Sequence, residues 1–322
     1  MRVSIAMATY NGAKYIQEQL DSFLEQTMLP DELIVTDDGS RDDTLAVVEA
    51  FASHAPFKVH VYRNERNLGY SKNFESAIGY CSGDIIFLSD QDDFWLPEKI
   101  RTITQVFVED PEVWVLINDT EITDERLLRT GRSKARQVEA LGLSSDSFIT
   151  GCCTAFRKAM VPLICPVPDC GVSHDSWLHA LGNVLGIRRL VPQVLQLYRR
   201  HDDNASQWLG SSKARLGRAD QIKSYATRDP RPWCRQRLAQ LVLLEERIRA
   251  RRQVIAGLPK AEERFIKGVG EIERMRRASS KRLSLLERRR IERLIPACHM
   301  FCIGDYKYFS GWKSLAKDIL VS

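Results

Sequence analysis

The chain has 322 residues, 44% of them hydrophobic and 28% charged, which is the balance of a globular protein with room for two structural units. No apolar run approaches the roughly 20 residues that span a bilayer, and the N-terminus has no signal-peptide pattern, so we expect a cytoplasmic protein. Eight cysteines without a C-x-x-C pair argue against a zinc ribbon and against a disulfide framework.

The net charge of +5 hides an uneven distribution along the chain. Residues 1–204 contain 20 Lys and Arg against 30 Asp and Glu, whereas residues 205–322 contain 27 against 12. Such a split indicates two units with different partners. We therefore predict an acidic unit over residues 1–205 and a basic region over residues 206–322.

The start of the acidic unit alternates short apolar runs with segments whose apolar residues recur at helical spacing. The runs predict strands over residues 3–8, 32–36, 58–62 and 85–88. This β-α alternation predicts an α/β fold in which helices connect the strands of a mostly parallel sheet.

An acidic turn follows the second expected strand, where Asp37 and Asp38 adjoin Gly39. Ligands of open α/β sheets collect at the carboxyl ends of the strands, so Asp38 is placed to accept the N3–H of a uracil or thymine. The alternative is that both carboxylates only favour the positive end of the following helix.

A second acidic turn follows the fourth expected strand and contains Asp90, Asp92 and Asp93. Three clustered carboxylates repel one another unless a cation neutralises them, and their oxygens suit Mg²⁺ or Mn²⁺. We interpret this turn as a divalent-metal site on the same sheet edge. A solvated acidic turn before a helix that begins near Pro97 is the alternative.

Four motifs follow one another in the first third of the chain. They are Ala8-Thr9-Tyr10-Asn11, Asp37-Asp38-Gly39-Ser40, Asn67-Leu68-Gly69 and Asp90-Gln91-Asp92-Asp93-Phe94-Trp95. In this order and spacing they resemble glycosyltransferase family 2, and the last motif is most similar to bacterial rhamnosyltransferase-type members. The resemblance covers residues 1 to about 205 and implies a GT-A fold, a Rossmann-like nucleotide-sugar domain with a metal-binding D-x-D motif.

The resemblance implies one set of residues for the nucleotide-sugar donor. These are Ala8, Thr9, Tyr10, Asp38, Gly69, Lys72, Asp90 and Asp92. Asp38 would hold the base and Asp92 would face the ribose. Gly69 would permit a close approach of the backbone to the nucleotide, and Lys72 would reach the phosphates.

The resemblance also implies a set of metal ligands, namely Asp92, Asp93 and His201, with Asp90 in support. His201 lies in the segment 198–206, which is similar to the Tyr-Arg-x-His-x-x-Asn-x-Ser segment of the family. The expected cofactor is Mn²⁺ or Mg²⁺.

A general base is needed if an acceptor hydroxyl is to attack a sugar. Family members carry it in a short Glu-Asp or His-Asp pair, which indicates Asp175, directly after His174. The alternative is that Asp175 only caps the apolar helix that follows. We interpret the adjacent Cys152 and Cys153 as buried apolar fillers and not as nucleophiles.

The basic region predicts helices. Cys234, Leu241, Ile248 and Ile255 recur at sevens on an otherwise basic segment, and residues 274–293 form a second basic helical stretch before an aromatic tail. Such helices either pack on the catalytic unit or contact an anionic membrane surface; nucleic acid is a third alternative that we do not expect.

These patterns predict an inverting, metal-dependent glycosyltransferase of the hexosyltransferase type. By resemblance, the donor is a dTDP- or UDP-sugar, with rhamnose as the sugar, and the acceptor is a lipid-linked saccharide of a bacterial surface polysaccharide such as O-antigen or capsule. The protein would meet this acceptor peripherally at the cytoplasmic face of the inner membrane. The rival hypotheses are a metal-dependent nucleotidyltransferase and a non-catalytic protein that binds membrane or nucleic acid.

Overall fold

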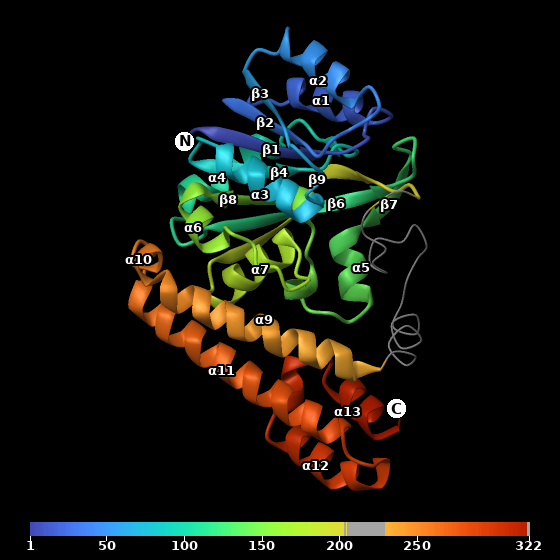
Figure 1. The fold of residues 1–322 in the computed structure, drawn as a ribbon, viewed down its shortest axis with the longest axis vertical. Coiled ribbons are helices and arrows are strands. Elements are labelled where there is room, and N and C mark those ends of the chain that lie inside the picture. The colour runs from blue at the N-terminus through green and yellow to red at the C-terminus, as the bar shows by residue number, and fades with distance from the viewer. Residues whose placement is uncertain (203, 205–228, 321–322) are drawn as a thin grey trace.

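The computed structural model describes residues 1–202, 204 and 229–320. A large sheet with its helices forms the upper part of the molecule, and two long helices run below it toward a smaller helical group that holds the C-terminus (Figure 1). The predicted α/β fold with a basic helical C-terminal region is therefore confirmed. The predicted boundary between residues 205 and 206 lies outside the described residues.

The described residues form one nine-stranded sheet in the order β3-β2-β1-β4-β8-β6-β9-β5, with β7 paired to β6. The strands are β1 (Val3–Thr9), β2 (Glu32–Asp37), β3 (Lys58–Arg63), β4 (Ile85–Ser89), β5 (Phe94–Trp95), β6 (Val115–Thr123), β7 (Arg129–Ser133), β8 (Thr154–Arg157) and β9 (Arg188–Arg199). The four strands expected from the sequence, β1 to β4, pair in parallel. Their carboxyl ends therefore meet at one edge, and both acidic turns lie there.

Helices cover both faces of the sheet. The described helices of this part are α1 (Ile16–Leu24), α2 (Thr44–Ala52), α3 (Tyr70–Tyr80), α4 (Lys99–Glu109), α5 (Lys134–Ala140), α6 (Val161–Ile164) and α7 (His174–Val184). Apolar side chains of α1, α2 and α4 pack on one face, and those of α3, α6 and α7 pack on the other. In α1, the residues Ile16, Leu20 and Phe23 recur at helical spacing and are fully buried, so they form the side of the helix that faces the sheet.

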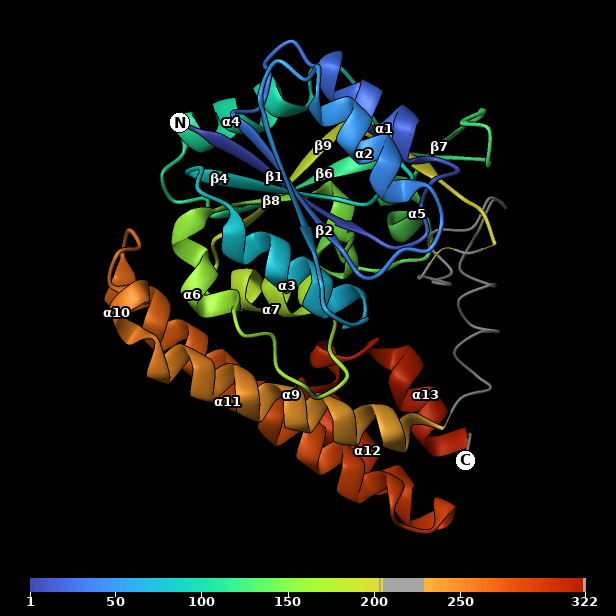
Figure 2. The same ribbon diagram turned by 45° about the horizontal axis from the view of Figure 1, so that its top comes forward.

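The C-terminal helices share a core with the sheet domain. They are α9 (Pro230–Ala250), α10 (Arg252–Ile255), α11 (Ala261–Leu286), α12 (Arg290–Cys302) and α13 (Trp312–Leu320). Leu241 and Ile248, two positions of the predicted seven-residue repeat, lie in the same cluster as Trp177 and Leu181 of α7. The interpretation that α9 and α11 pack on the catalytic unit is therefore confirmed, and Figure 2 shows both helices running along that side.

The far end of the helical region has its own small core around a buried ion pair. Arg282 of α11 and Asp318 of α13 are 1% and 0% exposed, and Arg282 Nε donates to Asp318 Oδ2 at 2.7 Å. Tyr306 donates its hydroxyl to the same oxygen at 2.9 Å. Leu285, Ala297 and Met300 pack with Tyr306 in one apolar cluster.

We expect Asp318→Ala to destabilise the helical region by about 3–5 kcal/mol, because it leaves the charge of Arg282 buried without compensation. The measurement is urea unfolding followed by circular dichroism. Asp305→Ala is the matched control, since Asp305 pairs with the half-exposed Lys281 at 2.9 Å and such pairs contribute about 1 kcal/mol or less. Equal losses in the two variants would contradict the role given to the buried pair.

Candidate active site

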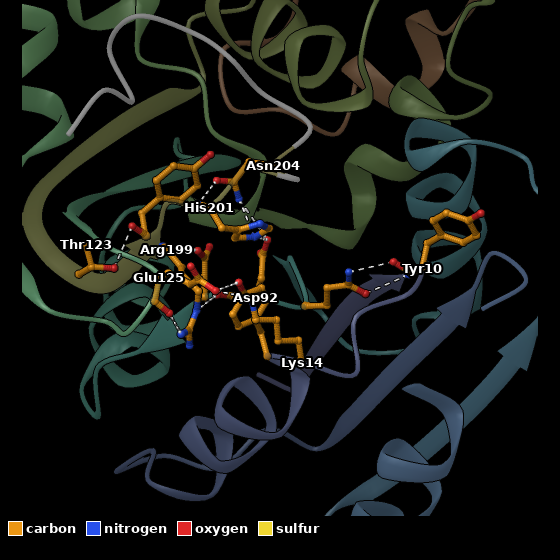
Figure 3. Close-up of polar contacts among 12 residues, drawn as sticks. Tyr10, Lys14, Asp92, Thr123, Glu125, Arg199, His201 and Asn204 are labelled. Carbon is orange, nitrogen blue, oxygen red and sulfur yellow. Dashed lines mark hydrogen bonds and ion pairs between the residues drawn. The ribbon is translucent and has the colours of Figure 1, made fainter. Parts of the chain in front are cut away.

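The second acidic turn connects β4 to β5, and the end of β9 lies directly beside it. β5 pairs with β9 in antiparallel fashion, with Phe94 opposite Leu197. This pairing brings Gln196, Arg199 and His201 against the turn, more than 100 residues away in sequence. Figure 3 shows the side chains of Arg199 and His201 gathered around Asp92.

Asp93 lies beneath the turn and has no exposed surface. One of its oxygens accepts the backbone N–H of Arg199 at 3.1 Å, and the other accepts Gln196 Nε2 at 3.0 Å. Burial, assisted by the charge of Asp92, raises the pKa of Asp93 to about 7. The structure thus uses this predicted metal ligand as an internal anchor for β9.

A buried lysine supports the acidic turn from below. Lys99 is 1% exposed. Its ammonium donates hydrogen bonds to Gln196 Oε1 and, at 2.9 Å, to the carbonyl of Cys152. The ammonium also lies 3.8 Å from the ring centroid of Trp95. Burial lowers its pKa to about 8. Sequence reasoning missed Lys99, although its four-residue spacing to Ile103 and Phe107 places it on the core face of α4.

Arg199 fixes the backbone of the same turn. Its guanidinium, also buried, donates from Nε to the carbonyl of Asp92 at 2.7 Å and from a terminal nitrogen to the carbonyl of Glu125 at 2.5 Å. The remaining nitrogen forms an ion pair with Glu18 of α1. These bonds join three separate segments of the chain.

Asp92 and His201, two predicted metal ligands, are brought together. His201 Nε2 lies 2.8 Å from Asp92 Oδ2, and Asn204 Nδ2 donates to the same oxygen at 3.2 Å. The other ring nitrogen of His201 is buried without a hydrogen-bond partner among the described residues. A carboxylate beside an imidazole is a donor set that suits Mn²⁺, so these residues fit the expected metal.

Asp90, Asp93 and Cys152 form a second cluster of potential ligand atoms in the described part of the chain, with all three atoms within 4.8 Å of one another. Burial raises the pKa of the Cys152 thiol well above its ordinary value, and metals bind the deprotonated form. Burial and the neighbouring carboxylates also raise the pKa of Asp90. A protonated, buried thiol agrees with the interpretation of Cys152 as a filler.

The first acidic turn organises the loop before α3. Asp38 accepts the backbone N–H groups of Leu68 and Gly69, both at 2.8 Å, and Asn64 Nδ2 at 2.9 Å. Gly69 has a φ of +81°, a backbone conformation that residues other than glycine rarely adopt. The predicted nucleoside residue Asp38 and the predicted approach residue Gly69 are thus in direct contact.

The end of β1 is tied to the second acidic turn through Gln91. Its side-chain oxygen accepts the Tyr10 N–H at 2.9 Å, and its amide donates to the Tyr10 carbonyl at 3.1 Å (Figure 3). A Cβ at Gly12 would lie 2.2 Å from Gln91 Oε1, so only glycine leaves room for this clamp. The Tyr10 ring stays about half exposed.

Thr9, Ala8 and Lys72, the other residues predicted to bind the sugar donor, differ in their contacts. Thr9 donates its hydroxyl to Asp37 at 3.0 Å, and Ala8 packs partly buried against the core. Lys72 bonds at 2.9 Å to Glu75 and to the carbonyl of Val167, so its ammonium is already engaged.

Asp175 lies in the first turn of α7, but Ser173 is the N-cap, with its hydroxyl accepting Ser176 N–H at 3.4 Å. Asp175 Oδ1 also accepts this N–H, at 2.7 Å, and the Ser173 hydroxyl. Burial raises the pKa of Asp175, but His174 and these hydrogen bonds outweigh it and hold the pKa below its usual value. A Cβ at Gly151 would lie 3.6 Å from the Cβ of Asp175, and the next residue, Cys152, clusters with Asp90, so Asp175 lies near the second acidic turn.

Comparison with known proteins shows which family and fold this chain is similar to. Residues 4–162 match the family model described as glycosyl transferase family 2. An uncharacterized protein of Mycobacterium tuberculosis is 27% identical over 205 residues, which cover 62% of this chain and 59% of that protein. The dTDP-rhamnosyl transferase RfbG of Shigella flexneri is 36% identical over 106 residues, which cover 32% of this chain and 37% of the relative.

The chain therefore spans less than two thirds of the length of these curated relatives. The crystal structure of S. aureus TarS in complex with UDP has the same fold, with a TM-score of 0.53 at 17% identity over 86% of this chain and 91% of that one. The GT-A architecture expected from the motifs is thus confirmed. Residues 4–162, the part that matches the model of glycosyl transferase family 2, hold all four motifs and most of the sheet.

Proposed function

We propose that this protein is an inverting, metal-dependent glycosyltransferase. The observation that carries the proposal is the grouping of the site's carboxylates: Asp92 lies 2.8 Å from His201, and Asp90 clusters with Cys152, whose neighbour Gly151 lies beside Asp175. In the reaction, the acceptor oxygen forms a bond to the anomeric carbon, and the bond from that carbon to the diphosphate breaks. The electron pair leaves with the nucleoside diphosphate, and the hydroxyl proton passes to Asp175.

The metal would be held by Asp92 and His201, with Asp90 beside them. When bound, Mn²⁺ or Mg²⁺ neutralises the charge that develops on the diphosphate leaving group. Asp93 and Lys99 keep the acidic turn in place from beneath, as their burial and hydrogen bonds indicate.

The donor is a nucleotide sugar that occupies the same sheet edge. The exposed ring of Tyr10 offers a face on which the nucleotide base can stack. Tyr10 follows β1 and Asp38 follows the neighbouring strand β2, so both lie at the same edge of the sheet. The relative named dTDP-rhamnosyl transferase favours dTDP-rhamnose as the donor. The acceptor we propose is a lipid-linked saccharide in the synthesis of a bacterial surface polysaccharide.

A nucleotidyltransferase would also use a metal and a nucleotide, but its products differ. Glycosyl transfer or donor hydrolysis releases a nucleoside diphosphate from a nucleotide sugar. Incubation of the protein with dTDP-rhamnose, UDP-sugars and Mn²⁺ tests the proposal. A parallel incubation with nucleoside triphosphates and sugar 1-phosphates tests the rival activity, which would be favoured if diphosphate is released there and no nucleoside diphosphate is released from the nucleotide sugars.

The first expected outcome concerns the metal ligands. Asp92→Asn and His201→Ala should weaken Mn²⁺-dependent donor binding by roughly 10- to 100-fold in calorimetry. Asp93→Ala should instead lower the melting temperature, because it removes the acceptor of the buried Arg199 N–H and one of the two acceptors of Gln196 Nε2. His54→Ala, on the exposed end of α2, is the control; loss of metal dependence in Asp93→Ala with an unchanged melting temperature would return the ligand role to Asp93.

The second expected outcome concerns the base. Asp175→Asn should lower turnover by roughly 10²- to 10⁴-fold, the range for a lost acid–base group, at unchanged donor affinity. The fold should hold, because Ser173 remains as the N-cap of α7. Turnover at saturating substrates is measured beside a melting curve, with Asp169→Asn, the nearest upstream carboxylate, as the control. Normal turnover in Asp175→Asn would remove Asp175 from the mechanism.

We also propose that α12 rests on an anionic membrane. Its solvent-facing side carries apolar residues at helical spacing: Ile291, Leu294, Ile295 and Phe301, of which Ile291 is 89% and Ile295 81% exposed. Met300, Ala297 and Arg293 are buried on the opposite side. Figures 1 and 2 place α12 at the end of the helical region away from the sheet.

Charge supports a lipid surface as the partner of this helix. Arg288 and Arg289 precede α12, are exposed and have no described carboxylate partner, and anionic headgroups attract such residues. None of the helices in residues 1–202 and 229–320 has the length and apolarity to cross a bilayer. Contact through α12 would therefore be peripheral.

Ile291→Glu with Ile295→Glu should weaken binding to phosphatidylglycerol vesicles at least tenfold, because each buried isoleucine contributes about 1.5–3 kcal/mol. Vesicle sedimentation is the measurement, and binding of the unmodified protein should fall as salt rises. Val108→Glu with Ile266→Glu changes the charge equally at exposed apolar positions elsewhere. Absent binding by the unmodified protein, or equal losses in both double variants, would refute the membrane contact.

A further inference from the structure

A cleft of about 520 Å³ lies where the sheet domain meets the helical region. Tyr70 lines it from the loop that Asp38 holds, Ser173 and Ser176 line it from the first turn of α7, and Trp233 and Arg237 line it from α9. Both serines bond to the carboxylate of Asp175. The cleft thus opens beside the proposed base and next to the donor loop.

Arg237 is the cation of this cleft. Its Nε is buried without a hydrogen-bond partner, and no described carboxylate forms an ion pair with its guanidinium. Its guanidinium lies 5.0 Å from the ring centroid of Trp233 and 5.7 Å from that of Phe309. Asp318 of α13 is already paired with Arg282.

The guanidinium of Arg237, unpaired among the described residues, is suited to bind an anion. A guanidinium offers a fork of donors that matches a phosphate or a carboxylate, and a buried donor without a partner costs free energy until a ligand supplies the acceptor. The neighbouring arginine, Arg282, disfavours any cation in this part of the cleft.

The remaining lining suits a sugar. Trp233 and Tyr70 are 44% and 54% exposed and present aromatic faces, on which the apolar face of a sugar ring can pack. The side chains of Gln240 and Asn183 line the same cleft and offer donors and acceptors for hydroxyl groups.

We propose that this cleft is the acceptor site and that the acceptor is a saccharide with a phosphate or diphosphate group, which binds Arg237 while a sugar hydroxyl lies at Asp175. This inference rests on the proposed glycosyl transfer and adds the chemical class of the acceptor. The phosphate can belong to a free sugar phosphate or to a lipid-linked diphosphate sugar, because both carry the same chemistry to Arg237.

The test measures binding of three kinds of probe by quenching of tryptophan fluorescence. The probes are N-acetylglucosamine 1-phosphate and glucose 1-phosphate, their short-chain prenyl diphosphate counterparts, and the neutral sugars. Arg237→Gln should weaken binding of the anionic probes roughly 10- to 100-fold and leave neutral sugars unaffected. Arg235→Gln, two residues away on the exposed side of α9, should behave as the unmodified protein; among the described residues, Arg235 forms an ion pair with Glu287.

Gln240→Glu is the second variant, because a carboxylate in the cleft should repel the same probes even if Arg237→Gln fails to fold. The tighter of the two anionic probe classes identifies the source of the phosphate. The proposal is overturned if the unmodified protein shows no preference for anionic probes, or if the folded variants bind them as tightly. Donor hydrolysis is measured in parallel: it should persist in Arg237→Gln, and its absence from the unmodified protein would count against the proposed transfer and leave the binding result to decide the cleft.

Discussion

Charge crowding at one sheet edge is the constraint on which the rest of this structure depends. Three carboxylates within four residues repel one another, and buried groups of the chain offset this repulsion through hydrogen bonds and positive charge. Asp93 is tied to β9, Lys99 supplies a buried positive charge through Gln196, and Arg199 holds the backbone. With Asp93 turned inward, Asp92 is left to face His201 at the surface of the site. The conformation of the acidic turn therefore depends on the pairing of β5 with β9, which brings Gln196 and Arg199 against it.

The same arrangement explains why the proposed reaction needs several parts of the chain. The donor loop comes from the start of α3, the metal residues from the turn after β4 and from the segment after β9, and the base from α7. The helical region completes the enclosure, because Trp233 and Arg237 of α9 face the first turn of α7 across a cleft. A site built from separate segments can combine charges that no short stretch of sequence would hold together.

Local patterns allowed the sequence to predict strands β1 to β4, the two acidic turns and the buried stripe of α9. These features depend on neighbouring residues, through strand periodicity, helical spacing and turn chemistry. The roles of Gln196, Arg199 and Lys99 depend instead on contacts across more than 50 residues, and no motif marks them. For the same reason the sequence did not distinguish Asp93, which is buried against β9, from Asp92, which contacts His201: adjacent acidic residues look alike in sequence, and the path of β9 decides which of them is buried.

The continuous core between α7 and α9 has a practical consequence for protein engineering. Leu241 and Ile248 belong to the same cluster as Trp177 and Leu181, so separating α9 from the sheet domain would expose apolar surface on both fragments. Chimeras that exchange the helical region between related proteins would have to exchange the facing side of α7 as well. If the cleft binds the acceptor as proposed, acceptor preference could be transferred only with both surfaces together.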